Sequence, residues 1–233
     1  MCFLLLISWN AFQTFNQNQN FNLMKLRRIL IVIVAVSALG ISFVWFSTSK
    51  PENRIYEKPV AEKIALEGFS NLWRISDSVY RSEQPGKREM RGLEKFGIKT
   101  VLNLRNYHSD NDEAKGTALV LEHLTMNAGE INEQDILLTM KIIRTAKKPV
   151  LIHCLHGSDR TGCMVASYRI IFQNWSKDDA IKELRNPAFG YHEKWFPNIM
   201  ETLKSLDVIK FRKELNLTEK DLHLVFNKMP NEQ

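Results

Sequence analysis

The chain has 233 residues, of which 44% are hydrophobic and 25% charged, and its formal net charge is +6. This length suffices for one globular domain with a substantial core and a smaller appendage. The modest positive charge suits an anionic substrate or membrane surface, and no basic run is dense enough to indicate a nucleic-acid-binding protein. Of the three cysteines, Cys2 lies outside the domain and Cys163 is expected in its core, so the sequence predicts no disulfide framework.

The N-terminal segment is predicted to lie outside the globular domain. Residues 1–23 carry an Asn/Gln-rich tract with no reason to pack, so we expect an untranslated or disordered leader and a true start at Met24. Residues 24–48 contain an uncharged apolar stretch from Ile29 to Phe46, and its length of about 18 residues approaches that needed to span a bilayer. We therefore expect one transmembrane signal-anchor helix over residues 24–48.

Basic residues precede this apolar stretch, at Lys25, Arg27 and Arg28, whereas few follow it. Under the positive-inside bias the N-terminus stays in the cytoplasm and the rest of the chain crosses the membrane. A cleaved signal peptide is the alternative, because a peptidase could cut at the small residues 47–49. Prolines and scattered charges over residues 49–66 indicate a linker to a domain that occupies residues 67–233.

Strand and helix patterns alternate through this domain. We expect a hairpin at 72–81, strands at 99–104, 121–126 and 149–152, a polar loop with helical potential at 108–120, and helices at 86–96, 132–146, 161–175, 176–185, 192–213 and 218–227. This alternation predicts an α/β fold with a central, mostly parallel sheet flanked by helices and preceded by the transmembrane helix.

The most informative segment follows the last of these strands and reads His153-Cys154-Leu155-His156-Gly157-Ser158-Asp159-Arg160-Thr161-Gly162. Between a strand and a helix N-terminus, backbone N–H groups can converge on an anion, and the positive end of the helix dipole faces it. The same field favours the thiolate of Cys154, which is a nucleophile. Arg160 can close the ring of donors with a planar fork that matches two phosphate oxygens.

This Cys-x5-Arg-Thr-Gly loop resembles that of the cysteine-dependent protein phosphatases, in particular the compact dual-specificity branch and its bacterial periplasmic tyrosine phosphatases. The resemblance covers most of residues 70–190 and includes the segments Leu72–Ile75, Val79–Pro85, Thr100–Arg105, Tyr168–Ile170, Trp175–Lys177, Ala180–Glu183 and Phe189-Gly190. It implies an enzyme that hydrolyses phosphotyrosine, phosphoserine or phosphothreonine in proteins through a cysteinyl-phosphate, without a metal or another cofactor.

The resemblance also assigns roles within the loop. Cys154 would attack phosphorus, and the phosphate would be bound by Leu155, His156, Gly157, Ser158, Asp159 and Arg160. His153 would hold the cysteine backbone, and the hydroxyl of Thr161 would hydrogen-bond the thiolate.

The general acid is the weak point of the resemblance. The family supplies an Asp from the loop before the helix that precedes the catalytic strand, but this chain has Gly129 there. Asp159, inside the phosphate loop, is our preferred proton donor, as proposed for phosphatases that resemble myotubularins. Glu130 is the alternative, and Asp110 or Asp112 could swing in from another loop.

The substrate remains open between several classes. The phosphate loop carries no lysine at its variable positions, which favours a phosphoprotein over an inositol polyphosphate. A membrane-proximal domain keeps a phosphoinositide or other lipid phosphate as the alternative, and a non-catalytic phosphate-binding pseudophosphatase is the rival from another class. The resemblance places the domain in the periplasm, on a single-pass inner-membrane anchor or free after signal cleavage, and the sequence leaves the oligomeric state undetermined.

Overall fold

A computed structural model of the chain describes residues 59–218, whose strands form one six-stranded sheet. Its strands are β1 (Glu62–Lys63), β2 (Trp73–Ser76), β3 (Val79–Ser82), β4 (Thr100–Asn103), β5 (Val120–His123) and β6 (Val150–His153). Their order across the sheet is β1-β2-β3-β6-β4-β5. The four strands from β3 to β5 are parallel, whereas β1 and β2 pair antiparallel at the other edge. The sheet is therefore mostly parallel, as predicted, and it is mixed because β1 and the 72–81 hairpin add an antiparallel edge.

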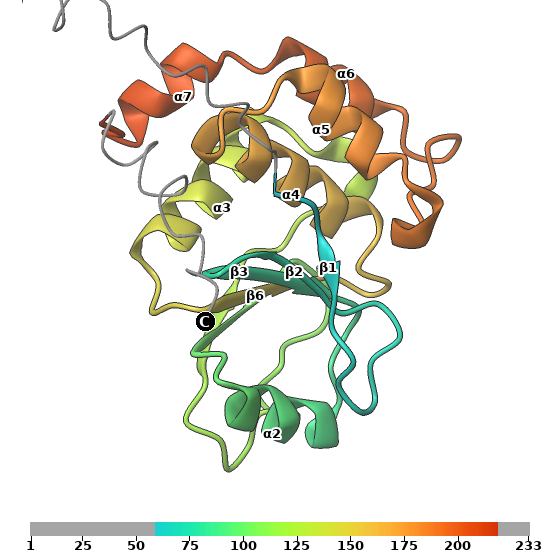
Figure 1. Cartoon of the computed structure of the whole chain (residues 1–233), viewed down its shortest axis with the longest axis vertical. Coiled ribbons are helices and arrows are strands. Elements are labelled where there is room, and N and C mark those ends of the chain that lie inside the picture. The colour runs from blue at the N-terminus through green and yellow to red at the C-terminus, as the bar shows by residue number, and fades with distance from the viewer. Residues whose placement is uncertain (1–58, 219–233) are drawn as a thin grey trace, which may run out of the picture. The chain divides into compact units, whose positions relative to one another are not determined.

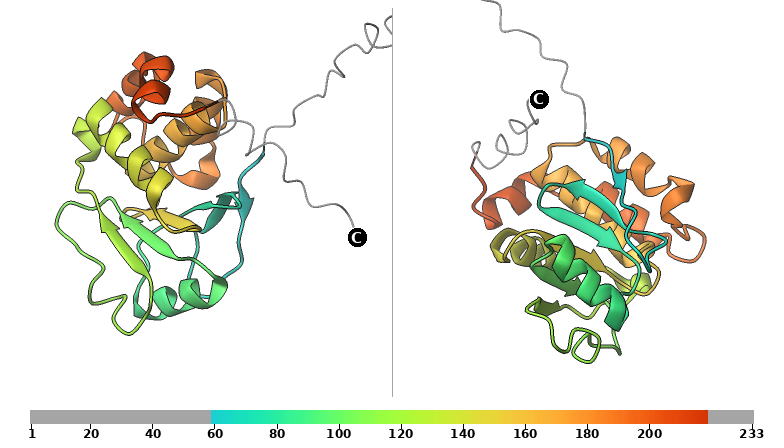
Figure 2. Two further views of the ribbon diagram at one scale, coloured as in Figure 1. Left: turned by 90° about the vertical axis from the view of Figure 1, so that its left-hand side faces the viewer. Right: turned by 60° about the horizontal axis from the view of Figure 1, so that its bottom comes forward.

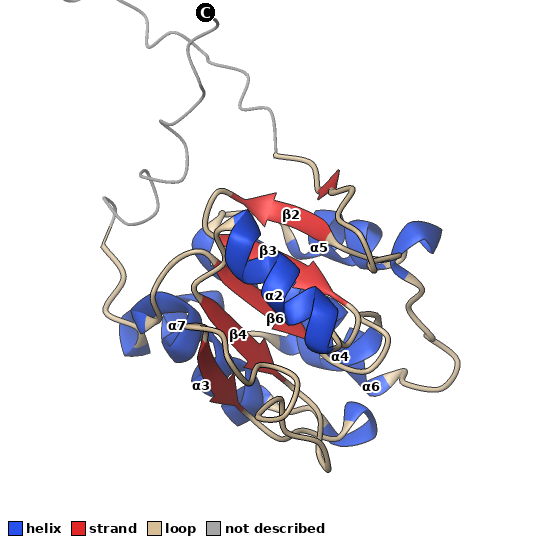
Figure 3. Ribbon diagram, turned by 90° about the horizontal axis from the view of Figure 1, so that it is seen from below, coloured by secondary structure: helices blue, strands red, loops and turns tan. Residues whose placement is uncertain are grey.

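Helices cover both faces of this sheet (Figures 1 and 2). They are α2 (Lys87–Phe96), α3 (Glu133–Thr145), α4 (Asp159–Phe172), α5 (Lys177–Leu184), α6 (Asn198–Ser205) and α7 (Val208–Glu214). Helix α2 lies on one face, and Figure 3 shows it crossing in front of β3 and β6, while the others lie on the opposite face. Side chains of β6 alternate between the two faces of the sheet. Leu151 packs in the core under α2, and Val150 and Ile152 pack in the core under the other helices.

Most of the predicted elements are present with ends shifted by a few residues. Helix α2 ends at Gly97, whose φ of 109° is the left-handed conformation that glycine adopts readily. The polar segment 108–120 forms turns instead of the helix that its pattern permits. The tail predicted as one helix over 192–213 is instead divided into α6 and α7, because Asp207 caps a new helix by accepting a hydrogen bond from the backbone N–H of Lys210 at 3.0 Å.

The predicted leader (1–23), the anchor (24–48), most of the linker (49–66) and the last predicted helix (218–227) lie outside the described residues. Within residues 59–218, no helix has both the length and the apolar character needed to cross a bilayer. The described part of the linker contains β1, which pairs with β2.

Candidate active site

The phosphate loop connects β6 to α4 at the carboxyl end of the parallel strands. Strand β6 lies between β3 and β4, so the loop opens near the middle of the sheet edge (Figure 3). Helix α4 begins at Asp159, within the loop itself, and its first N–H groups have no partner inside the helix. This is the position where an open parallel sheet places its ligand, and where a helix N-terminus favours an anion.

The scaffold around the loop turns the loop carbonyls outward. Four consecutive carbonyl oxygens of the loop each accept a hydrogen bond. Leu155 O accepts from Gln84 N at 3.1 Å, His156 O from Asn71 Nδ2 at 3.0 Å, Gly157 O from Arg81 Nη2 at 2.5 Å and Ser158 O from Gly162 N at 2.8 Å. A trans peptide unit points its C=O and the following N–H in opposite directions. The outward carbonyls therefore leave the intervening N–H groups directed toward the inside of the loop, as an anion-binding nest requires.

Gly157 is required by the path of the loop. Its φ is 72°, and a Cβ placed on it would lie 2.5 Å from the carbonyl oxygen of Ser82. Any side chain would therefore collide with the backbone of β3 and strain the loop. The glycine lets the loop pack directly against the end of the neighbouring strand.

Arg81, on β3, supports the loop from beneath. Its guanidinium is fully buried, donates to Gly157 O and stacks on Phe189, with Cζ 4.4 Å from the ring centroid. Burial lowers the pKa of Arg81 to about 10, which still leaves the side chain protonated at neutral pH. A buried cation next to the loop favours an anion within it, and its interaction with Cys154 is attractive when the thiol is ionised.

The two cysteines of the described residues differ in chemistry. Both are free thiols and both are buried, Cys154 in the loop and Cys163 inside α4. Burial, with a smaller contribution from Asp135, raises the pKa of Cys163 to about 12. Cys163 therefore stays a neutral thiol in the core, as predicted from the sequence.

His153 lies between two hydrogen-bond acceptors. Its Nε2 is 2.7 Å from Oδ2 of Asp110, and its Nδ1 is 3.2 Å from the carbonyl oxygen of Cys154. An ionised carboxylate can only accept, so Nε2–H of His153 donates to Asp110 and the ring is held between this carboxylate and the backbone of Cys154. The contact with the cysteine backbone is the one that the sequence analysis expected of His153.

Asp110, one of the alternative acids considered from the sequence, is held by three hydrogen bonds. Its Oδ1 accepts hydrogen bonds from Gln84 Nε2 at 2.9 Å and Asn103 Nδ2 at 3.0 Å, and Oδ2 faces His153. Burial alone would raise the pKa of Asp110, but the hydrogen bonds from His153 and Gln84 outweigh it, so the pKa lies below its ordinary value. Asp110 is an ionised partner of His153.

Arg160, at the end of the loop, has one guanidinium nitrogen held by backbone carbonyls. Its Nη1 donates to the carbonyl oxygens of Leu104, at 3.3 Å, and Met126, at 3.5 Å. This contact fixes the guanidinium while its other N–H groups can bind substrate oxygens. The hydroxyl of Thr161 is buried and has no hydrogen-bond partner among residues 59–218, so its expected contact with the thiolate stays a prediction.

The two candidate acids lie in different environments. Asp159 is buried, and its carboxylate accepts the backbone N–H of His192 at 2.8 Å and contacts the His192 ring Nδ1 at 3.0 Å. Glu130 lies exposed at the end of the short 3₁₀ turn Ala128–Glu130, beside Gly129. The sequence analysis did not identify His192.

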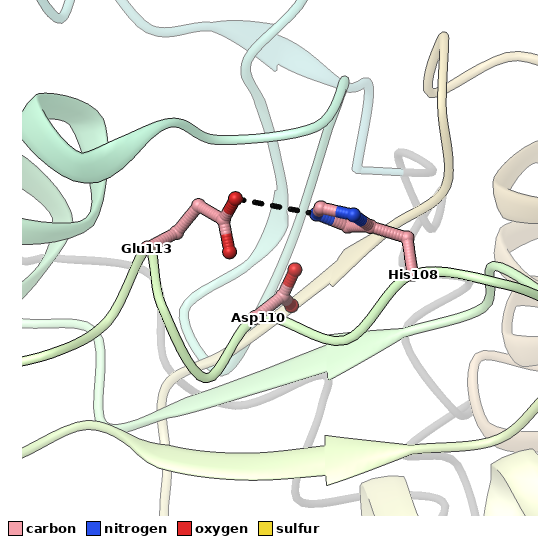
Figure 4. A group of neighbouring side chains, drawn as sticks. All are labelled: His108, Asp110 and Glu113. Atoms are coloured by element: carbon pink, nitrogen blue, oxygen red, sulfur yellow. Dashed lines mark ion pairs between the residues drawn. The ribbon is translucent and has the colours of Figure 1, made fainter.

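One group of possible metal ligands occurs among residues 59–218, formed by His108, Asp110 and Glu113, with ligand atoms within 4.8 Å of one another. Figure 4 shows the ring of His108 facing the carboxylate of Glu113, with its Nε2 3.4 Å from Oε1. Asp110 is already used by its three hydrogen bonds. An ion pair and a hydrogen-bonded carboxylate account for this group, and we assign no metal to it.

Comparison with known proteins agrees with this geometry. Residues 76–174 match the family model described as "Polymorphic toxin system, DSP-PTPase phosphatase". The dual specificity protein phosphatase TpbA of Pseudomonas aeruginosa is 31% identical over 169 residues, covering 71% of this chain and 73% of that protein. This chain belongs to the cysteine-dependent dual-specificity phosphatases. It is therefore a phosphatase.

Solved structures and a second relative extend the comparison. A crystal structure of P. aeruginosa TpbA in complex with phosphotyrosine superposes on this phosphatase with a TM-score of 0.61 and 26% identity, covering 68% of this chain and 96% of that one. The inositol diphosphatase SIW14 of Saccharomyces cerevisiae is 32% identical over 138 residues, covering 55% of this chain and 48% of that protein. Relatives named as a protein phosphatase and as an inositol diphosphatase are thus both similar to this chain.

Proposed function

We propose that this phosphatase hydrolyses phosphotyrosine, phosphoserine or phosphothreonine in proteins through a cysteinyl-phosphate intermediate. The observation that carries the proposal is the set of outward-turned carbonyls, which leaves the loop amides facing the inside of the loop that holds Cys154 and Arg160. These amides and the guanidinium match the charge that develops on the equatorial oxygens of a transferring phosphoryl group.

The proposed reaction has two displacements. In the first, Sγ of Cys154 attacks phosphorus in line, so that an S–P bond forms while the P–O bond to the leaving group breaks and the leaving oxygen takes up a proton. In the second, water attacks the cysteinyl-phosphate and loses a proton, the S–P bond breaks, and the thiolate and inorganic phosphate are released.

A trapping experiment tests this mechanism. The protein is mixed briefly with a radiolabelled phosphotyrosine peptide and quenched in acid, and the label should appear on Cys154. Cys154→Ser should bind vanadate and carry no label, because the amides and Arg160 remain while the thiolate is lost. Turnover by Cys154→Ser would contradict the proposal.

The surroundings of the loop support a protein substrate. Two large apolar side chains stand exposed at the loop: Leu155, within it, is 42% exposed, and Trp195, stacked on the ring of His192, is 73% exposed. Such side chains can contact a peptide or a phenyl ring. Asp159 also places a carboxylate in the loop, which disfavours a highly charged inositol polyphosphate.

The inositol diphosphatase relatives make an inositol substrate the second candidate. A comparison of kcat/KM on a phosphotyrosine peptide and on an inositol pyrophosphate separates the two. We expect the peptide to be preferred. A preference for the inositol pyrophosphate would move this phosphatase to the substrate class named for SIW14.

A further inference from the structure

The short 3₁₀ turn Ala128–Glu130 supplies no evident proton donor for the leaving group. Gly129 has no side chain, and its backbone N–H is used by the side chain of Asn127 at 3.2 Å. Glu130 is exposed, and its backbone N–H and C=O bond to Asn127 and Asn132 within the same turn. Neither residue shows a side-chain contact that would hold a carboxyl group over the phosphate loop.

Asp159 is in the loop, but its contacts fit the ionised form. Oδ1 accepts the backbone N–H of His192 at 2.8 Å, and the ring Nδ1 of His192 lies 3.2 Å from Oδ1 and 3.0 Å from Oδ2. Oδ1 is thus occupied as an acceptor of the backbone N–H, and an ionised Asp159 with a proton on Nδ1 of His192 satisfies all of these contacts. Asp159 is therefore placed to orient the ring of His192.

His192 has the position and the chemistry of a proton donor. Its ring stacks on Trp195, with centroids 4.9 Å apart and planes 10° from parallel, and faces the ring of His156 at 6.4 Å. Both His156 and Asp159 belong to the phosphate loop, so His192 lies at the rim of the loop. Its side chain is 39% exposed, so with Nδ1 held by Asp159 the ring can present Nε2–H to a bound substrate.

We infer that His192, oriented by Asp159, supplies the proton to the leaving oxygen in the proposed reaction. This inference rests on the proposed function and revises the preferred donor from Asp159 alone to the pair. In the first displacement Nε2–H passes its proton to the leaving oxygen, and the ring becomes neutral while Nδ1–H stays with Asp159. In the second, Nε2 takes a proton from the attacking water and the imidazolium is restored. A carboxylate that holds the second nitrogen of a histidine is the usual support for such a role.

The test compares substrates that differ in their need for a proton. p-Nitrophenyl phosphate has a good leaving group, whereas phenyl phosphate has a poor one that must be protonated as the bond breaks. His192→Gln should lose about 10²-fold or more in kcat/KM on phenyl phosphate, the range of general acid catalysis, and far less on p-nitrophenyl phosphate. Asp159→Asn should show the same selectivity to a smaller degree, because His192 is then present but poorly oriented.

Two further variants and a binding measurement make the result decisive. Glu193→Gln removes a neighbouring exposed carboxylate that pairs with Arg185, and it should leave the ratio between the two substrates unchanged. Vanadate binding reports whether each variant keeps a folded loop, and His192→Asn replaces His192→Gln if the latter fails to bind. The inference would be overturned if His192→Gln lost kcat/KM equally on both substrates, or lost none. It would also be overturned if Glu130→Gln showed the selective loss on phenyl phosphate instead. If the trapping experiment placed no label on Cys154 of the unchanged protein, that result would instead contradict the proposed function.

Discussion

Oδ2 of Asp110 lies 2.7 Å from Nε2 of His153, a residue with no exposed surface that directly precedes the proposed nucleophile. The other ring nitrogen faces the carbonyl oxygen of Cys154. The imidazole of His153 thus links the carboxylate of Asp110 to the backbone of Cys154. This link connects the loop after β4 to the end of β6, directly before Cys154, and it gives the buried carboxylate of this polar segment a structural role.

Asp110→Asn should impair catalysis without removing any group that touches the substrate. The amide replaces the charged hydrogen-bond acceptor of His153 with a neutral one, so the backbone of Cys154 is held less firmly and kcat/KM should fall by about 10- to 100-fold, in line with roughly 1.5–3 kcal/mol for a hydrogen bond to a charged group. Steady-state kinetics on an aryl phosphate measure the effect. Glu113→Gln, a carboxylate of the same loop that faces His108 instead, is the control and should retain near-normal turnover.

The same pair predicts a pH dependence of stability. Hydrogen bonds in the folded protein hold the pKa of Asp110 below its ordinary value of 3.8, so its contribution to stability is present above that value and is lost as the pH falls through the lowered pKa. The difference in unfolding free energy between the unchanged protein and Asp110→Asn should therefore be largest near neutral pH and shrink below 3.8. Denaturant titrations across this range measure it, and a difference that grows in acid would contradict the assignment.

The elements that the sequence predicted well are those with local signals. Helix α2 has an apolar face and a terminal glycine, and α5 begins at Ser176, whose hydroxyl accepts the backbone N–H of Asp179 at 3.1 Å. Such signals lie within a few residues of the feature that they predict. The chemistry of Cys154 and Arg160 was recognisable for the same reason, because the whole loop is contiguous.

The support of the loop could not be predicted in this way. Asp110, Arg81 and His192 lie 43, 76 and 33 residues from their partners in the loop or beside it. Nothing in the local pattern distinguishes a buried Asp that holds a histidine from a solvated one. The Tyr-Arg-Ser segment that contains Arg81 did contribute to the family resemblance, but its role under the loop emerges only when β3 and β6 are paired.

Arg81→Met should weaken anion binding by the loop. Methionine keeps much of the volume but removes the charge and the donor to Gly157 O, so a buried carbonyl loses its partner at a cost of about 1–3 kcal/mol. Vanadate affinity should fall, and iodoacetamide should alkylate Cys154 more slowly. Arg88→Met, which removes an exposed arginine that pairs with Glu67, should change neither. Unchanged vanadate affinity in Arg81→Met would show that the guanidinium only fills space.

The two buried cysteines should react differently in the native protein. Burial raises the pKa of Cys163 to about 12, so this thiol stays neutral and should resist alkylation near neutral pH. Cys154, at the helix N-terminus, should be modified, and vanadate should protect it. Peptide mass spectrometry after brief exposure to iodoacetamide distinguishes the two sites. Modification of Cys163 at a rate equal to that of Cys154 would mean that α4 opens readily or that the field of the loop does not act on Cys154.

The compartment in which the phosphatase works is a further proposal, drawn from charge. We propose that residues 24–48 anchor the chain in the inner membrane with Lys25, Arg27 and Arg28 in the cytoplasm, which places the phosphatase domain in the periplasm. Fusion of reporters after Gln233 tests the orientation in a Gram-negative host. Alkaline phosphatase should be active there, and a fluorescent protein that matures only in the cytoplasm should stay dark. The reverse result would place the domain in the cytosol, and release of the active fusion into the soluble periplasmic fraction would identify a cleaved signal in place of an anchor.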